Sequence, residues 1–455
     1  MIVAGDPFPY YELVRARLGD WGMLPFIGGM PPSGEEPTSG DGNPPGPRDG
    51  TTATAGLPAE QVGGSAGAGG STPGDAGTGV VLSIGSTIDG FRTRQLQLNL
   101  SDTKLNQLNI GVVGDLGTGK TQLLKSLIMQ ISASARYNRG IKPRFLIFDY
   151  KKDYGSDDFV AATGAKVIKP HRIPLNLFDT RQMPETVAPW LDRFRFFADV
   201  LSKIYSNIGA VQRDNLKRAV KSAYEGVRPG RQPTLNDVHR AYSGIVEGKV
   251  DSPLSIIGDL VDMEIFASRD QEAIPFNEFF DGVVVISLDA LGTDDYSKNM
   301  LVAVMLNMFY ENMLQTPKRP FIGSEPQLRA IDSYLLVDEA DNIMKYELDV
   351  LKRLLLQGRE FGAGVILASQ YLRHFKVNAT DYREPLLTWF VHKVPNITAA
   401  ELSKLGLSMA ASEVAERIEG LANHQCLYNT HDTPGEMIRG LPFFELMRGR
   451  HDQDS

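Results

Sequence analysis

The chain has 455 residues, of which 42% are apolar, so it can bury the core of one large α/β domain or of two or three ordinary ones. Its formal net charge is −8 and its sequence pI is near 5.5, so any contact with nucleic acid has to be local rather than spread over a basic surface. The single cysteine, Cys426, excludes an intrachain disulfide and a cysteine-rich metal site. No signal peptide is visible, and the longest apolar run, 300–310, is too short to span a bilayer; we expect a cytoplasmic protein with no membrane partner.

The N-terminal part divides into two segments of different composition. Residues 1–30 are rich in aromatic and apolar types and are interpreted as a strap packed on the main domain, a docking segment for a partner, or the remnant of a larger upstream region. Residues 31–79 consist mainly of Gly, Pro, Ser, Thr, Ala and Asp and contain no aromatic residue. Such a segment cannot bury enough apolar surface to offset the entropy of ordering, so we predict a disordered linker. The main domain is predicted to span 80–455.

An apolar strand at 110–113 leads into a glycine-rich turn and then into an amphipathic helix predicted for 122–131. The turn has the G-x-x-x-x-G-K-T pattern of a phosphate-binding P-loop, in which backbone N–H groups and a helix N-terminus face the phosphates. Lys120 is predicted to reach the β- and γ-phosphates, and the Thr121 hydroxyl to coordinate Mg²⁺. A chance match is the alternative, which the flanking strand and helix disfavour. We therefore expect ATP and Mg²⁺ as cofactors. The predicted nucleotide-binding residues are Gly114, Asp115, Leu116, Gly117, Thr118, Gly119, Lys120, Thr121 and Gln122.

Apolar strands alternate with helices along the rest of the chain, which predicts an α/β fold with a mostly parallel, doubly wound sheet. Strands are predicted at 80–84, 96–100, 144–149, 165–168, 282–288, 334–339, 364–370 and 425–428. Helices are predicted in an insertion at about 183–275 and at 299–315, 346–359, 399–405 and 410–419. Ligands of such sheets bind beyond the carboxyl ends of the strands. Asp149, Asp338, Glu339 and Gln370 fall at such ends.

The strand 334–337 is closed by two acids, the Walker B pattern. Asp338 is predicted to hold Mg²⁺, and Glu339 to orient and deprotonate the attacking water. A solvated strand end is the alternative for this pair. Gln370 ends the next strand, where its amide can contact the γ-phosphate; the alternative is a hydrogen-bonded turn residue.

Arg359 lies between a helix and the 364–370 strand and is predicted to act as an arginine finger on the nucleotide of a neighbouring subunit. An ion pair with Glu360 or another acid is its alternative. Lys151 and Lys152 follow Asp149; they could touch phosphate or DNA, although a solvated loop is the favoured interpretation.

Contact with nucleic acid is predicted at two basic segments. One is the stretch 371–376, which mixes aromatic and basic side chains suited to backbone contacts and stacking. The other comprises Lys203, Arg213, Lys217 and Arg218. Solvated helix faces are the alternative for each. The histidines show no ligand-spaced pair, so we predict no zinc site.

Several stretches together resemble the HerA/FtsK group of P-loop motor ATPases: 109–121, 149–151, 174–178, 336–340, 358–362 and 367–370. The resemblance covers about 80–441 and implies a RecA-like P-loop NTPase fold. It also implies a homo-oligomer, a hexameric ring around double-stranded DNA, with ATP between subunits and the finger arginine supplied in trans. Lys120, Thr121, Asp338, Glu339, Gln370 and Arg359 would then take the roles given above.

More narrowly, the chain resembles the ATPase region of the DptH proteins, HerA-like components of phosphorothioation-dependent restriction systems in bacteria. Those proteins are usually longer, so the chain would correspond to a C-terminal motor region. The resemblance implies an antiviral defence role with other defence-system proteins as partners, a nuclease among them. The function expected is therefore an ATP-hydrolysing DNA translocase or helicase-like motor. The alternatives are a nucleotide-dependent switch or scaffold, and a conjugation- or secretion-type ATPase.

Overall fold

The computed structural model describes residues 79–89, 92–183, 186–205, 208–322 and 328–454. The strap or docking segment predicted for 1–30, and the linker predicted for 31–79 apart from its last residue, lie outside these ranges. No helix in the described ranges is both long and apolar enough to cross a membrane.

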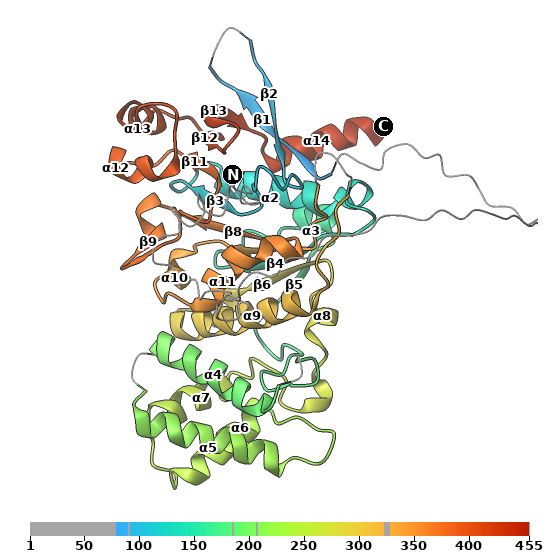
Figure 1. Cartoon of the computed structure of the whole chain (residues 1–455), viewed down its shortest axis with the longest axis vertical. Helices are drawn as coiled ribbons and strands as arrows, with labels where there is room; N and C mark the ends of the chain where they lie inside the picture. The colour runs from blue at the N-terminus through green and yellow to red at the C-terminus, as the bar shows by residue number, and fades with distance from the viewer. Residues whose placement is uncertain (1–78, 90–91, 184–185, 206–207, 323–327, 455) are drawn as a thin grey trace, which may run out of the picture. The chain divides into compact units, whose positions relative to one another are not determined.

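Eleven strands of the described chain form one sheet in the order β2-β1-β13-β12-β11-β3-β8-β7-β4-β6-β5 (Figure 1). The strands are β1 (Val81–Thr87), β2 (Gln95–Asn99), β3 (Ile110–Val113), β4 (Arg144–Asp149), β5 (Lys166–Ile168), β6 (Val283–Ser287), β7 (Ser333–Val337), β8 (Ala363–Ser369), β11 (Thr388–His392), β12 (Gln425–Asn429) and β13 (Pro434–Gly440). The strands from β11 to β5 are parallel to their neighbours. The other four extend the sheet with antiparallel pairs. The mostly parallel sheet confirms the predicted fold class.

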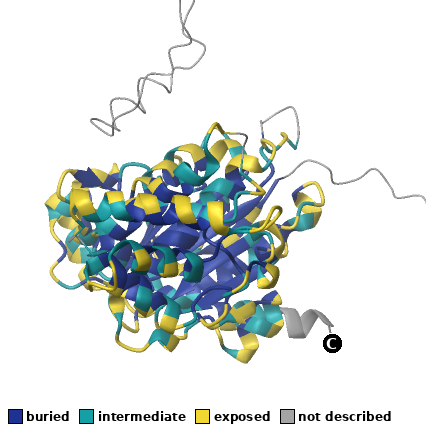
Figure 2. Cartoon of the chain, turned by 90° about the horizontal axis from the view of Figure 1, so that it is seen from below, coloured by how far each residue is buried: buried dark blue, intermediate teal, exposed yellow. Residues whose placement is uncertain are grey.

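Helices cover both faces of the parallel region. The helices are α2 (Lys120–Ser132), α3 (Asp157–Thr163), α4 (Pro189–Tyr205), α5 (Ala210–Gly226), α6 (Leu235–Ile245), α7 (Ser252–Asp262), α8 (Phe276–Phe279), α9 (Asp295–Gln315), α10 (Asp341–Met344), α11 (Asp349–Gln357), α12 (Ala399–Leu402), α13 (Ala411–Glu419) and α14 (Phe443–Asp454). Every residue of β3, β7 and β8 is buried, as expected for strands covered on both sides (Figure 2). Alternate residues face opposite sides, so Ile110 and Val112 join Leu127 of α2 in one apolar cluster.

The helices α4 to α7 form a lobe beyond α9 in Figure 1 and lie within the range predicted for a helical insertion. An ion pair of 2.8 Å between Arg193 on α4 and Glu311 on α9 ties this lobe to the sheet-covering helices. Helix α6 begins with a capping contact, in which the carboxylate of Asp237 accepts the backbone N–H of Thr234 at 2.9 Å.

Some elements differ from the sequence prediction. The helix expected at 346–359 is shorter, because only 349–357 is helical, as α11, and it is followed by a 3₁₀ turn, η4 (Gly358–Phe361). Strands β11 and β13, the hairpin of β9 (Lys376–Val377) and β10 (Thr380–Asp381), and helix α14 were not expected. Strand β11 is short but central, since it pairs in parallel with β3, the strand before the P-loop. Its place in the sheet depends on pairing between residues almost 280 positions apart. Such pairing cannot be predicted from the pattern of neighbouring residues.

Candidate nucleotide-binding site

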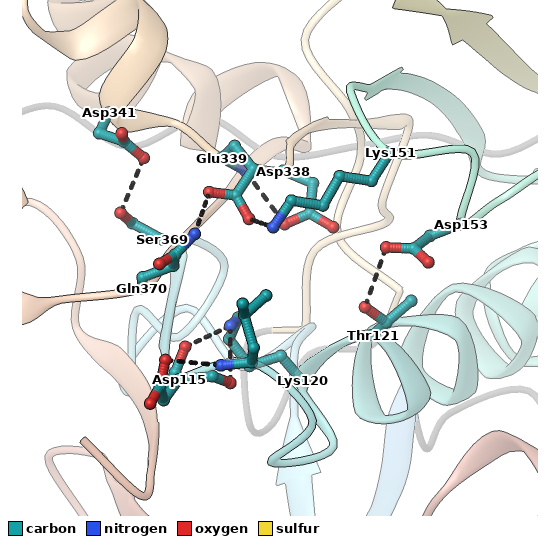
Figure 3. A network of polar contacts seen from close by, with 12 residues as sticks. Asp115, Lys120, Thr121, Lys151, Asp153, Asp338, Glu339, Asp341, Ser369 and Gln370 are labelled. Atoms are coloured by element: carbon teal, nitrogen blue, oxygen red, sulfur yellow. Dashed lines mark hydrogen bonds and ion pairs between the residues drawn. The ribbon is translucent and has the colours of Figure 1, made fainter. Parts of the chain in front are cut away.

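Four neighbouring strands, in the order β3, β8, β7 and β4, carry the predicted chemistry at their carboxyl ends. The P-loop follows β3, Gln370 follows β8, the acidic pair Asp338 and Glu339 follows β7, and Lys151 comes shortly after β4. Because parallel strands lie about 4.8 Å apart, their ends meet at one edge of the sheet. The structure therefore brings most of the predicted site residues together (Figure 3).

Glycines give the P-loop its shape. Gly117 and Gly119 have φ angles of +75° and +104°, in the left-handed region that other residues rarely adopt. A Cβ added at Gly119 would lie 2.6 Å from His424 Nδ1, and one at Gly114 would lie 2.6 Å from His392 Cβ. The loop is thus narrow, tightly backed by other parts of the chain, and suited to backbone contact with phosphates.

Lys120 begins α2 and turns its ammonium group back onto the loop, where the carbonyls of Gly114 and Asp115 accept hydrogen bonds, the second at 3.2 Å. The residue is only 8% exposed. Burial lowers the pKa of Lys120, while the nearby carboxylates of Asp338 and Glu339 raise it. A buried ammonium group whose partners are neutral carbonyls can exchange them for a phosphate oxygen. This turn therefore fits a nucleoside triphosphate.

Asp338 follows β7 and Thr121 lies in the first turn of α2, and both belong to the polar network of the site (Figure 3). The carboxylate of Asp338 accepts a hydrogen bond from the Tyr154 hydroxyl at 3.1 Å. Burial and the Glu339 carboxylate raise the pKa of Asp338 to about 6, although Lys120 partly offsets them. Thr121 Oγ1 lies 3.4 Å from a carboxylate oxygen of Asp153, a residue that the sequence analysis did not single out.

Oxygen donors of this kind are those that Mg²⁺ prefers, so the residues fit the ion. Thr121 and Asp338 would hold it, and the ion would supply positive charge at the phosphates. Within the described ranges, no group of three or more His, Cys, Asp or Glu side chains is arranged to hold a metal. An ion bound here would therefore need nucleotide oxygens and water to complete its shell.

Glu339 has both carboxylate oxygens engaged. Lys151 forms an ion pair with Oε1, and the Gln370 amide donates to Oε2 at 3.2 Å. The backbone of Glu339 has a φ of +56°, which is uncommon for a residue with a side chain. The Lys151 side chain is 40% exposed, yet its ammonium pairs with Glu339, so the favoured interpretation as a solvated loop residue describes it only in part. Lys152, in contrast, has a 72% exposed side chain and pairs with Asp289 at 3.0 Å.

Asp149 does not reach the phosphate region but shapes the loop that presents Lys151. Its carboxylate accepts the backbone N–H groups of Lys151, Asp153 and Tyr154 at 3.1, 3.1 and 2.9 Å. Burial raises the pKa of Asp149, and these hydrogen bonds counteract the rise.

Arg359 is not brought to the site. It lies in η4, before β8, whereas Gln370 follows β8, so the seven residues of the strand separate them by about 20 Å. Its guanidinium is on the surface and donates to the Thr103 carbonyl at 2.6 Å. Among the described residues Glu360 pairs with Lys318, and the alternative of an ion pair between Arg359 and Glu360 is not seen there. Arg359 can therefore act on a nucleotide only if that nucleotide belongs to another protomer.

Two histidines contact the P-loop without any signal in the sequence. His392 ends β11, is fully buried, and has no hydrogen-bond partner for either ring nitrogen among the described residues. Burial lowers the pKa of His392 to about 3, and Lys120 adds to the effect, so the ring is neutral. His424 donates its backbone N–H to the Thr118 carbonyl at 2.9 Å. His392 ends β11 and His424 lies in the turn directly before β12, so the C-terminal part of the chain backs the P-loop.

The two predicted nucleic-acid segments have different surroundings. Lys203 and Arg213 pair with Asp349 and Asp199 at 3.4 and 2.8 Å, which favours the interpretation of solvated, ion-paired helix faces. In the 371–376 segment, Leu372 and Phe375 are buried and hold the 3₁₀ turn η5 (Leu372–Phe375) in place. The exposed guanidinium of Arg373 stacks over the Tyr371 ring at 4.1 Å.

No protein-family model and no curated protein matches this sequence. Among solved structures, the chain is similar to VirB4 of Thermoanaerobacter pseudethanolicus, with 15% identity, a TM-score of 0.62, and coverage of 81% of this chain and 98% of that one. It is also similar to the bacterial conjugative coupling protein TrwBdeltaN70, with 15% identity, a TM-score of 0.50, and coverage of 75% and 87%. At this identity the likeness establishes the fold. The chain has the RecA-like P-loop ATPase fold, as predicted.

Proposed function

We propose that this protein is a Mg²⁺-dependent ATPase that works as a motor on double-stranded DNA. The observation that carries the proposal is the meeting of Lys120 with Asp338 and Glu339 in one charged cluster, although the lysine and the acids are more than 200 residues apart in the chain. ATP hydrolysis requires a group that binds the phosphates, a group that binds the metal and a base for the attacking water.

Each residue has a defined part in this proposal. Lys120 and the P-loop N–H groups bind the phosphates, while Thr121 and Asp338 hold Mg²⁺. Glu339 accepts the proton of the water that attacks the γ-phosphate, and Gln370 contacts that phosphate. A binding protein that only switched with the nucleotide would have no need of the second acid, Glu339, so its presence favours hydrolysis.

The position of Arg359 supports an oligomer, with a hexamer as the expected form. An exposed arginine at the amino edge of the sheet cannot serve its own nucleotide, but it can serve one bound by the next protomer. Double-stranded DNA is the expected substrate, and the stacked pair of Arg373 and Tyr371 together with Lys376 is suited to the phosphate backbone. A role in DNA defence, with a nuclease among the partners, follows from the sequence resemblance alone and stays a prediction.

A conjugation- or secretion-type ATPase is the second candidate. The fold similarity to VirB4 and to a conjugative coupling protein favours it. Both candidates predict ATP hydrolysis, and they differ in the partner proteins that the motor serves.

Steady-state ATP hydrolysis with and without linear duplex DNA tests the proposal. We expect a rate that rises several-fold with DNA, no nucleotide binding by Lys120→Ala, and binding with slow turnover by Glu339→Gln. Lys152→Ala, which removes an exposed lysine outside the site, is the control and should match the wild type. A near-zero rate that ignores DNA would support the switch or scaffold instead, and equal loss of binding in Lys120→Ala and Glu339→Gln would refute the division of roles.

The DNA contact can be located by two matched double variants. Arg373→Ala with Lys376→Ala is expected to abolish stimulation by DNA and to leave the DNA-independent rate unchanged. Lys217→Ala with Arg218→Ala, which removes the same charge from exposed positions on α5, is expected to retain stimulation. Loss of stimulation in the α5 variant, with stimulation retained in the other, would indicate that α5 makes the DNA contact instead.

A further inference from the structure

The base proposed for hydrolysis, Glu339, has a partner on each of its carboxylate oxygens in this arrangement. Lys151 holds one carboxylate oxygen and Gln370 the other (Figure 3). The structure therefore shows Glu339 in a restrained state.

The pair is part of the site rather than a surface contact. The Glu339 side chain is 9% exposed and that of Lys151 is 40% exposed, and the two residues follow different strands, β7 and β4. The backbone of Glu339 adopts a left-handed conformation, which is uncommon for a residue with a side chain. The pair joins a buried carboxylate to a partly exposed ammonium group, so Glu339 is the member that would need a new partner if Lys151 left it.

Lys151 also lies near the phosphate-binding lysine. Burial lowers the pKa of Lys120, and the Lys151 ammonium lowers it further, which places the two positive charges in one neighbourhood. Lys120 rests on the carbonyls of the P-loop and Lys151 rests on Glu339. Each ammonium group thus has a partner that a phosphate dianion can outcompete.

We propose that Lys151 exchanges partners when ATP binds: it leaves Glu339 for the γ-phosphate, and so releases the general base only when there is a phosphate to cleave. This inference depends on the proposed ATPase function and adds a residue to it. ADP has no γ-phosphate, so with ADP bound Lys151 stays on Glu339. Through this exchange the site distinguishes ATP from ADP before hydrolysis begins.

The test compares the affinities of the full chain for two nucleotides, the non-hydrolysable analogue ADPNP and ADP, each with Mg²⁺, by isothermal titration calorimetry. Lys151→Met should weaken the binding of ADPNP about tenfold to a hundredfold, as expected for loss of a charge-assisted hydrogen bond to phosphate. The affinity for ADP should change less than about threefold. Lys152→Met is the matched control, since it removes the adjacent exposed lysine, and should change neither affinity.

A second variant gives a change of opposite sign. Glu339→Gln removes the group that competes for Lys151, so ADPNP should bind several-fold more tightly, with ADP unchanged. In the double variant, Lys151→Met with Glu339→Gln, the gain should be lost, because it acts through Lys151. This comparison remains informative if Lys151→Met alone folds poorly, since the double variant leaves no unpaired charge at this position.

Three results would overturn the inference. They are equal weakening of ADPNP and ADP by Lys151→Met, unchanged binding of both, and a gain from Glu339→Gln that persists in the double variant. Failure of the wild-type chain to bind either nucleotide would instead refute the proposed function, so the two failures are distinguishable.

Discussion

Replacement of Asp338 by asparagine should stabilise the nucleotide-free protein at neutral pH, although the residue is assigned to the metal. The residue is 6% exposed, and burial together with the Glu339 carboxylate raises its pKa to about 6. Its ordinary value is 3.8, and one pKa unit corresponds to about 1.4 kcal/mol, so ionisation of Asp338 costs the folded state about 3 kcal/mol above pH 6. An amide of nearly the same shape avoids this cost.

The hydrogen bonds around the position can survive the change. In the wild type, one carboxylate oxygen accepts from the Glu339 backbone N–H at 3.1 Å and the other from the Tyr154 hydroxyl at 3.1 Å. Asparagine can accept from the first with its oxygen and donate to the tyrosine oxygen with its amide. The expected gain therefore comes from the removed charge.

The sign of the pH dependence follows from a carboxyl pKa that is higher in the folded than in the unfolded state. Between pH 4 and pH 6 the folded state binds more protons, so the wild type loses stability as the pH rises, and the loss is complete above about 6. The advantage of Asp338→Asn should thus be about 3 kcal/mol at pH 8 and about half of that at pH 5.

Urea unfolding without nucleotide or Mg²⁺ at the two pH values measures this difference. Asp281→Asn, which removes a 75% exposed carboxylate, serves as the control and should stay within about 0.5 kcal/mol of the wild type at both. An Asp338→Asn variant no more stable than the wild type at pH 8, or equally stabilised at both pH values, would refute the reasoning.

Other predictions concern the finger arginine and the core. Arg359→Ala should bind ADPNP normally and hydrolyse ATP at least about a thousandfold more slowly, and mixing it with Lys120→Ala subunits should restore part of the rate; absence of any recovery would count against action between protomers. Gly111→Ala would place a Cβ 2.4 Å from the tryptophan ring of β11 and should lower the free energy of unfolding by about 1–3 kcal/mol, whereas Gly226→Ala, with open space around it, should change it little, as urea unfolding would reveal. Cys426 is buried and its pKa is raised by that burial, so Ellman's reagent should label it only in denaturant; rapid labelling of the native protein would contradict the burial.

Part of this site could be read from short stretches of sequence. The P-loop is consecutive, its glycines are required by local backbone geometry, and its lysine and threonine follow at set positions, so Lys120 and Thr121 could be assigned roles without a fold. The strand ending in Asp338 and Glu339 was recognisable for the same reason, since its chemistry and its secondary structure lie in one run of residues.

The order of the strands in the sheet could not be predicted from local sequence patterns. Placing β8 between β3 and β7 brings Gln370 within 3.2 Å of Glu339, and placing β11 on the other side of β3 backs the P-loop with His392. Both arrangements depend on packing between residues far apart in the chain. The same is true of Lys151, which the sequence presented as one of two adjacent lysines with no means of telling them apart.

By itself, then, the amino-acid sequence determined the class of fold and the phosphate-binding turn, because alternating apolar periodicity and glycine-dependent backbone conformations are properties of neighbouring residues. Only the tertiary structure decided which lysine enters the site, that Arg359 stands at the opposite edge of the sheet, and that both oxygens of Glu339 are engaged. These are contacts between residues on separate strands, and they exist only once the sheet has assembled.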